Sequence, residues 1–419
     1  MSNRTLVHRR RLVGALVAVL ATALSTVAQA TPPARGGYQV TVLAGLGPEP
    51  NIAVSPSGQK VMVGGGGASP STFFLSVDHG KTYVQLHPTF LVSGGADFDL
   101  EWLNETTLVA ADLSVTGQGV LVHRSTDSGH TWTTTVLDED VYDRPWIGHA
   151  GNTVYVATRG LADHVPYLFV STDGGQTFGP PEPIVAPEDV DGLSNQPGMV
   201  LAHLAVAPDG TLYVLEEDAA GLKVLRRQPG LPAHYVVGPV AAVQPANGFD
   251  WLTVDDAGTL YVLSHEVRAG VMGAWLYVSR DRGQTWTAGT NLTAGARSTA
   301  WGAIASAGRG RLSLVYLRGE KPDALTAQNW WAEVARVDHA DTAHPAVHAA
   351  RPVAEVLHHG ALCSNITCAP ADRALYDYIS TAVGRDGVRY AVVTSSASRI
   401  AGTKQSGGLT GLVFRHPAG

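Results

Sequence analysis

The chain has 419 residues with 29 basic and 36 acidic side chains, a formal charge of −7, and only 16 % of its residues are charged. This acidic balance argues against a nucleic-acid-binding protein, and the low content of charge argues against long disordered segments. The 47 glycines and 24 prolines favour many short strands joined by turns.

The first 30 residues have the pattern of a secretory signal peptide. Four arginines and no acid accompany the apolar run 12–24, and the sequence A-Q-A ends at Ala30. This pattern predicts cleavage after Ala30, with residues 31–37 as a short linker and a mature charge of 25 − 36 = −11. No later run has the length of a membrane span. We therefore expect a secreted protein, extracellular or periplasmic, that does not insert into membranes.

One octapeptide occurs four times with the pattern S-x-D-x-G-x-T-aromatic. Each copy follows an apolar or β-branched run and precedes a second extended run, which predicts strand, tight turn and strand. The aspartate can accept hydrogen bonds from backbone N–H groups two residues on, and the glycine can take a positive φ. The final aromatic residue can fold back onto the sheet. The copies are residues 76–83, 125–132, 171–178 and 279–286.

This octapeptide resembles the Asp-box, or BNR repeat, of the sialidase-like β-propellers. The segments D-R-P-W and C-S-N-I-T-C, the latter followed by D-R-A-L-Y-D-Y, are most similar to those of secreted, uncharacterised members of that superfamily. The resemblance implies an all-β propeller in which the box is a structural turn, remote from any functional site.

A second repeating unit, two short strands around a polar turn, occurs seven times. Counting boxes gives the same number when degenerate copies at Gln228, Asp338 and Pro417 are included, with most intervals near fifty residues. We therefore predict a seven-bladed β-propeller of four-stranded blades over residues 38–419, with six blades as the alternative. The units begin at Asn51, Asp99, Arg144, His203, Trp251, Ala303 and Ser380.

The two ends of the mature chain are expected to meet. Residues 38–44 form a strand-like run without a partner, and the chain stops where the last box turn would lie. We predict that this run pairs with residues 411–415 and closes the ring, which leaves no long open sheet edge. Residues 340–373 are longer than the repeat requires and are predicted to be an inserted loop. This loop contains Cys363 and Cys368, and in an exported chain their spacing predicts a small-loop disulfide.

Propellers usually bind ligands on the ring axis, at the face where the innermost strands begin, which we call the entry face. The resemblance to sialidases implies three arginines that hold a substrate carboxylate, a tyrosine nucleophile paired with a glutamate, and an aspartate acid/base. Guanidinium groups bind carboxylates bidentately, and a phenol needs a neighbouring base to attack. The candidates are Arg144, Arg297 and Arg373 for the clamp, Tyr378 for the nucleophile, Glu217 for its partner, and Asp97 or Asp99 for the acid/base.

Several features depart from the sialidase pattern or have structural explanations. The Arg-Ile-Pro motif expected before the first box is absent, because residues 49–52 are E-P-N-I. Aspartates at loop–strand junctions often cap backbone N–H groups. Tryptophans can pack between blades or stack on a sugar, and clustered carboxylates suit Ca²⁺. The tryptophans considered for substrate binding are Trp146 and Trp251, and the carboxylates considered for Ca²⁺ are Asp97, Asp99, Asp143 and Asp250.

Two classes of function remain open at this point. The charged and aromatic entry face favours a monomer that engages an extracellular glycan or another small or polymeric ligand, with exo-sialidase-type hydrolysis as its enzymatic form. The missing first-blade arginine favours a non-catalytic propeller that binds protein, polymer or metal, or serves as a scaffold. Fold alone does not decide between them, because propellers have many unrelated functions.

Overall fold

The computed structural model describes residues 27–418 except for 30–34, 67–71, 89–96, 115–118, 139–141, 164, 185–200, 219–220, 230–235, 243–249, 294, 363–373, 376, 401–402 and 405–407. Most of the expected leader, Arg373 and the expected disulfide between Cys363 and Cys368 lie outside the described residues. The disulfide and the signal peptide therefore stay predictions. Within the described part, no helix has the length and hydropathy of a membrane span.

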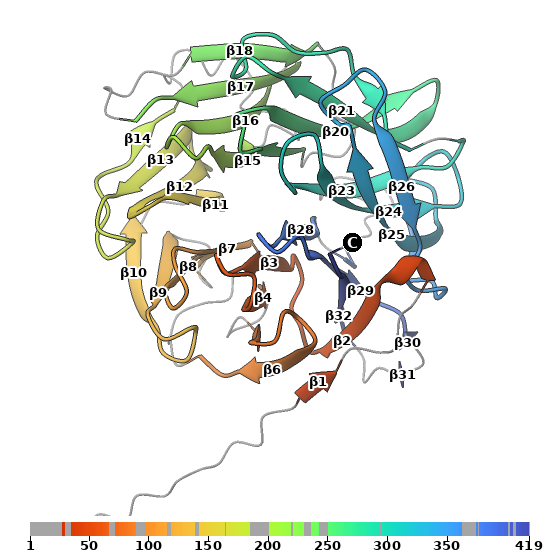
Figure 1. Ribbon diagram of the computed structural model, residues 1–419, viewed down its shortest axis with the longest axis horizontal. Helices are drawn as coiled ribbons and strands as arrows, with labels where there is room; N and C mark the ends of the chain where they lie inside the picture. Colours follow the sequence, from red (N-terminus) through yellow and green to blue (C-terminus); the bar gives the residue numbers. More distant parts are fainter. Residues whose placement is uncertain are drawn as a thin grey trace, which may run out of the picture.

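Seven antiparallel sheets surround a central axis, as Figure 1 shows, so the predicted seven-bladed propeller is confirmed. Counted outward, blade one is β3 (Asn51–Val54), β4 (Val61–Gly65), β5 (Thr72–Ser76) and β6 (Thr82–Leu86). Blade two is β7 (Phe98–Trp102), β8 (Leu108–Leu113), β9 (Val120–Ser125) and β10 (Thr133–Asp138). Blade three is β11 (Tyr142–Ala150), β12 (Thr153–Gly160), β13 (Pro166–Ser171) and β14 (Glu182–Pro183).

The remaining four blades repeat this order. Blade four is β15 (Leu201–Val206), β16 (Leu212–Asp218), β17 (Gly221–Arg227) and β18 (Val236–Ala241). Blade five is β19 (Trp251–Val254), β20 (Leu260–Arg268), β21 (Val271–Ser279) and β22 (Thr290–Asn291). Blade six is β23 (Thr299–Ser306), β24 (Leu312–Gly319), β25 (Gln328–Asp338) and β26 (Ala346–Ala350). Blade seven is β28 (Ser380–Val383), β29 (Arg389–Ser395), β32 (Thr410–His416) and β2 (Gln39–Ala44).

The N-terminal strand closes the ring as predicted. Strand β2 is the outermost strand of blade seven and pairs with β32 from Gln39 opposite Arg415 to Ala44 opposite Thr410. Just outside this ladder, the rings of Tyr38 and His416 meet edge to face, with centroids 4.8 Å apart. The first and last segments of the propeller are therefore joined in one sheet.

Two additional strands extend blades one and six. Strand β1 (Val27–Gln29), which lies within the expected leader, pairs with the outer edge of β6. Strand β27 (His358–Gly360) pairs with β25 alongside β26. Since β26 and β27 both fall within residues 340–373, the first part of the segment expected to be an inserted loop belongs to the sheet of blade six.

Hydrogen bonding within the box turns differs in one detail from the expectation. In the third box, Asp173 accepts bonds from the N–H groups of Gln176 and Thr177, at 3.0 and 2.9 Å, and from the Thr177 hydroxyl at 2.6 Å. The donors are thus three and four residues on, not two, because Gly174 and Gly175 both have positive φ and extend the loop. Each box lies where the third strand ends, so the boxes are on the face opposite the entry face.

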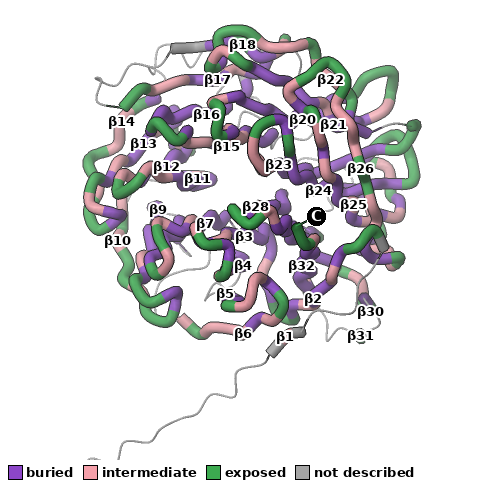
Figure 2. The backbone as a smooth tube through the Cα atoms, in the orientation of Figure 1, coloured by how far each residue is buried: buried purple, intermediate pink, exposed green. Residues whose placement is uncertain are grey.

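The middle strands of each blade are apolar on both faces because a neighbouring blade covers each face. In β12, for example, Val154, Val156 and Ala157 are fully buried, and Tyr155 is 4 % exposed. Figure 2 shows this burial continuing through the inner strands, whereas exposed residues follow the connecting turns. The inner strands therefore hold the residues around the axis on a rigid frame.

Candidate functional site

Charged side chains from six blades converge at the entry face. Most of them lie at or just before the start of an inner strand, and Glu217 lies near the end of β16, which reaches the same face because neighbouring strands are antiparallel. Electrostatic interactions link them through Arg144, Glu217 and Tyr378. We call this group the entry cluster: Glu49, Asp97, Asp143, Arg144, Glu217, Asp250, Asp377 and Tyr378.

Arg144 is the central cation of the entry cluster. Its Nη2 lies 2.7 Å from Oδ2 of Asp377, its Nη1 lies 3.6 Å from Oδ1 of Asp97, and its side chain is 8 % exposed. Burial by itself lowers the pKa of Arg144, but Asp97, Asp377, Asp143 and Glu49 together raise it above its ordinary value. Arg144 therefore stays charged and is held by carboxylates of the protein.

Among the described residues, the backbone is strained at three non-glycine residues close to the starts of inner strands. Glu49, Arg144 and Trp301 have φ values of 51°, 57° and 47°, in the left-handed region that side chains usually avoid. At Arg144 and Trp301 the strain coincides with irregular pairing, between Asp143 and Trp146 in β11 and near the start of β23. Each such residue costs about 1–3 kcal/mol and persists only where the surrounding structure enforces it. Bulges of this kind redirect side chains, here at the face that contains the entry cluster.

Asp97 is a carboxyl group that is partly protonated near neutral pH. Burial raises its pKa to about 7, Arg144 opposes the shift, and Asp143 adds to it through its charge and a side-chain hydrogen bond. Asp97 can thus donate or accept a proton at this face.

Glu217 and Asp250 form a second carboxyl pair, between blades four and five. Burial, and then the charge of Asp250, raise the pKa of Glu217 well above its ordinary value, although the Asp250 N–H donates to the Glu217 carboxylate. Burial also raises the pKa of Asp250 to about 7, while its Oδ1 accepts a bond from the His265 N–H at 3.1 Å. The Ser264 hydroxyl also interacts with the Asp250 carboxylate and opposes this shift, whereas Glu217 Oε1 is buried without a hydrogen-bond partner among the described residues. Two such carboxyls tend to share one proton, which gives one acid beside one base.

The Tyr378 hydroxyl is engaged with the backbone of β7. It accepts a bond from the Phe98 N–H and donates to the Phe98 carbonyl, each at 2.8 Å. Burial, followed by the charges of Glu49 and Asp97, raises the pKa of Tyr378 well above its ordinary value. This environment disfavours the phenolate that a nucleophile requires. The role of Tyr378 as nucleophile stays a prediction without support from this geometry.

The other residues predicted for a sialidase-type site are distributed differently. The Asp99 carboxylate accepts bonds from the Asn51 amide at 2.5 Å and the Ile147 N–H at 2.8 Å, so it joins blades one, two and three instead of entering the cluster. Arg297 is exposed at the entrance of blade six, and Arg373 is outside the described residues. Of the expected three-arginine clamp, the described structure brings only Arg144 into the entry cluster.

Trp146 and Trp251 are buried between blades. They are 1 % and 5 % exposed, and their rings lie 5.7 Å apart. The Trp146 ring also contacts Tyr378, at 5.3 Å. This packing matches the structural alternative for the two tryptophans and leaves little ring surface for a sugar.

No group of three or more histidine, cysteine, aspartate or glutamate side chains in the described residues is arranged to hold a metal ion. Of the four aspartates considered for Ca²⁺, Asp99 is occupied by Asn51 and Ile147, and Asp250 is bonded to the backbone of β20. Binding of Ca²⁺ at this face stays a prediction for which no donor set is assembled.

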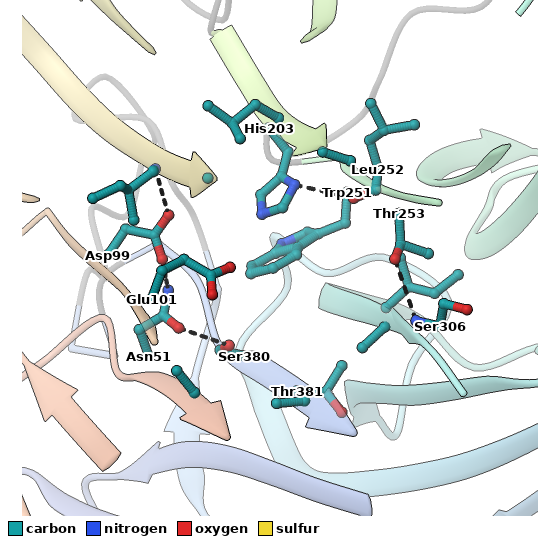
Figure 3. Close-up of a pocket in the computed structure, with 18 of the residues that line it drawn as sticks. Asn51, Asp99, Glu101, His203, Trp251, Leu252, Thr253, Ser306, Ser380 and Thr381 are labelled. Atoms are coloured by element: carbon teal, nitrogen blue, oxygen red, sulfur yellow. Dashed lines mark hydrogen bonds between the residues drawn. The ribbon is translucent and has the colours of Figure 1, made fainter. Parts of the chain in front are cut away.

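A channel of about 370 Å³ follows the axis below the entry cluster and is lined by the inner strands of all seven blades (Figure 3). Within the channel, Figure 3 shows the Glu101 carboxylate directed inward. Burial raises the pKa of Glu101 to about 7, so this carboxyl group is partly protonated near neutral pH.

Two members of the cluster were not assigned a role from the sequence. Glu49 lies two residues before its inner strand, and Asp377 lies three residues before its own. Asp97 has a comparable position, one residue before β7. Their equivalent positions in the repeat are a signal that could have identified them. The sialidase pattern instead predicts an arginine near position 49, where this chain has a glutamate.

One comparison with known proteins agrees with the repeat found in the sequence. Residues 277–288, around the fourth box, match the BNR/Asp-box repeat, and no curated protein matches the chain. Among solved structures, a protein of unknown function from Dyadobacter fermentans is similar at 12 % identity and a TM-score of 0.46, covering 90 % of this chain and 95 % of that one. An α-L-arabinanase from Penicillium chrysogenum is similar at 15 % identity and 0.46, covering 80 % and 100 %. A polysaccharide lyase of family PL25, an ulvan lyase, is similar at 11 % identity and 0.49, covering 88 % and 94 %. Because these identities and TM-scores are low, the similar structures do not indicate a ligand for this chain, and the ligand is inferred below from the residues of the site.

Proposed function

We propose that the entry cluster binds an extracellular carbohydrate and that Glu217 and Asp250 act on it as the acid and base of a glycoside hydrolase. The observation that carries the proposal is the buried carboxyl pair, in which both groups have raised pKa values and Glu217 Oε1 has no hydrogen-bond partner among the described residues. The secreted location rests on the signal-peptide pattern of the first 30 residues.

Glycoside hydrolysis needs two carboxyl groups in different protonation states. One protonates the leaving oxygen, and the other activates water or attacks the sugar. A carboxyl whose pKa is raised toward 7 is suited to be the acid at neutral pH. Burial supplies this condition at both groups, with the charge of Asp250 adding to it at Glu217 and the charge of Glu266 adding to it at Asp250.

The charge of the entry cluster favours a neutral sugar over an anionic one. Arg144 is the single cation among its eight members, and its guanidinium is already paired with Asp97 and Asp377. A sialic acid carboxylate would have to displace these partners while facing six carboxyl groups. The exo-sialidase form of the activity therefore receives less support than hydrolysis of a neutral glycoside.

The test is turnover of fluorogenic glycosides by the purified mature protein, with neutral glycosides and a sialoside in separate assays. We expect turnover of a neutral glycoside, reduced about 100-fold or more in Glu217→Gln and in Asp250→Asn. Glu216→Gln is the matched control, because Glu216 is the adjacent buried carboxyl on β16 and its charge partner is Lys223. Absence of turnover on every substrate, or variants as active as the wild type, would refute the hydrolase.

A non-catalytic scaffold is the second candidate, and one observation favours it. The ion pair between Arg144 and Asp377 is almost fully buried, with side chains 8 % and 3 % exposed, as expected for a group that holds blades together. A protein that neither binds glycans on an array nor hydrolyses glycosides, but melts at a lower temperature in Asp377→Asn, would support this candidate.

A further inference from the structure

A second concave site lies on the face opposite the entry face, between blades six and seven. It is a groove of about 930 Å³ that includes the turn between β28 and β29, the turn between β23 and β24, and the end of β25. Four arginines from separate parts of the chain line it, although the protein as a whole is acidic. We call it the arginine groove, after Arg311, Arg336, Arg385 and Arg389.

Arg389, the first residue of β29, is the most buried of the four. It is 8 % exposed, and no hydrogen bond or ion pair joins its guanidinium to another described residue; its Nε is buried without an acceptor. Burial lowers the pKa of Arg389, and the nearby charge of Arg336 lowers it further; Tyr38 and Asp338 oppose this shift, and Arg311 adds the smallest effect in the lowering direction. A buried charge without a counter-ion is unfavourable. An anion bound beside Arg389 would therefore be stabilised by its guanidinium group.

The carboxylates of the groove leave this charge uncompensated. Asp338 is paired with Arg336 at 2.8 Å and lies 3.5 Å from His348. Asp386 lies 3.0 Å from the His79 imidazole and accepts a bond from the Val388 N–H at 3.2 Å. Asp256 is exposed at the groove.

Three guanidinium groups thus remain available. Among the described residues Arg311, Arg385 and Arg389 have no ion pair, against the carboxylates of Asp256 and Asp386, because a neutral His79 does not cancel the charge of Asp386. The groove therefore has an excess of positive charge in spite of the three acids that line it.

We propose that the arginine groove binds an oxyanion, a phosphate or sulfate group, carried by a small ligand. Guanidinium groups present several donors in a fixed plane, which suits the oxygens of such groups. Arg389 would supply the buried contact, and the exposed Arg385 and Arg311 would close on the anion from the rim. The volume exceeds that of a bare anion and is in the range of sites for small organic ligands, so the charged group belongs to a larger molecule, such as a sugar ester.

Binding calorimetry on the full mature chain tests this proposal. Glucose 6-sulfate, glucose 6-phosphate and glucose are the probes, and the C-terminus carries no tag because Ala418 lines the groove. We expect the two esters to bind and glucose not to bind. Comparing the esters then distinguishes a sulfate site from a phosphate site. Equal binding of glucose, or no binding of either ester, would overturn the proposal.

Variants locate the binding. Arg389→Gln should weaken ester binding about ten-fold or more, and Arg385→Gln, at an exposed position, should weaken it without affecting the fold. Arg399→Gln is the control, because Arg399 is an exposed arginine near blade seven that does not line the groove. Ester binding unchanged in both Arg389→Gln and Arg385→Gln would refute the site. This result is independent of glycoside turnover, since Glu217 and Asp250 lie at the other face.

Discussion

Arg144 of blade three and Asp377 before blade seven form a hydrogen-bonded ion pair, with Nη2 and Oδ2 2.7 Å apart. These residues belong to blades that are not neighbours in the ring, so the pair crosses the axis at the entry face. It connects blade three to blade seven, in addition to the pairing of β2 with β32 that closes the ring.

Removing the acid of this pair should destabilise the fold. Asp377→Asn leaves Arg144 buried with the more distant Asp97, and an incompletely paired buried charge costs about 3 kcal/mol or more. We expect the free energy of unfolding, measured by urea denaturation, to fall by this amount. Asp338→Asn is the control, because its pair with Arg336 is partly exposed and such pairs contribute about 0–1 kcal/mol. Equal losses in the two variants would show that the axial pair is no stronger than a surface pair.

Stability should decrease as the pH rises from 5 to 8. The pKa values of Asp97 and Asp250 are raised to about 7 in the folded chain, whereas unfolded aspartate titrates near 4. The stabilising contribution of each protonated carboxyl is full below about pH 4 and is lost as the pH rises through about 7, on the order of 2 kcal/mol per group. Thermal melting across this range measures the effect.

Asp250→Asn tests the assignment of this pH dependence. The variant removes one titrating carboxyl, so its melting temperature should change less between pH 5 and 8 than that of the wild type. Asp173→Asn should leave the dependence in this range unchanged, since hydrogen bonds from Thr177 lower the pKa of Asp173. An identical pH profile for Asp250→Asn and the wild type would contradict the raised pKa.

The box turns should respond to acid in the opposite sense. The hydroxyl and the N–H of Thr285 donate to Asp281 and lower its pKa to about 2. This contribution to stability is present above about pH 4 and is lost as the pH falls through about 2. Asp281→Ala should therefore melt a few degrees lower at pH 7 and lose less stability than the wild type on acidification. A variant with the wild-type acid profile would rule out this role for Asp281.

Signal-peptide cleavage can be checked directly on exported protein. N-terminal sequencing should find Thr31 as the first residue, because the A-x-A sequence ends at Ala30. This cleavage removes β1 from the edge of β6, where it contributes three residue pairs. A mature chain that begins before Val27 would instead retain β1 as part of blade one.

Most of the fold could be predicted from local patterns. Each box combines an aspartate, a glycine and a threonine at fixed spacing, and each inner hairpin has its own polar turn, so repeats could be counted without knowing their contacts. Residues 38–44 form a strand-like run without a local partner, and the last blade lacks its outer strand. Pairing the two predicted ring closure, because it leaves no open sheet edge. These features depend on residues close together in the sequence, and the chain by itself determined them.

The contents of the candidate site were decided by the tertiary structure. Arg144 enters the cluster because its backbone takes a positive φ in an irregular part of β11, and its partner Asp377 is 233 positions away. Asp99, predicted beside Asp97, points instead to Asn51 and Ile147, because Asp99 lies within β7 between blades one and three whereas Asp97 lies before that strand. Arg389 has no counter-ion because the packing of blade six against blade seven places it beside Arg336, which is already paired with the nearby Asp338. Burial and charge pairing depend on which blades meet across the ring, and no local pattern of residues contains that information.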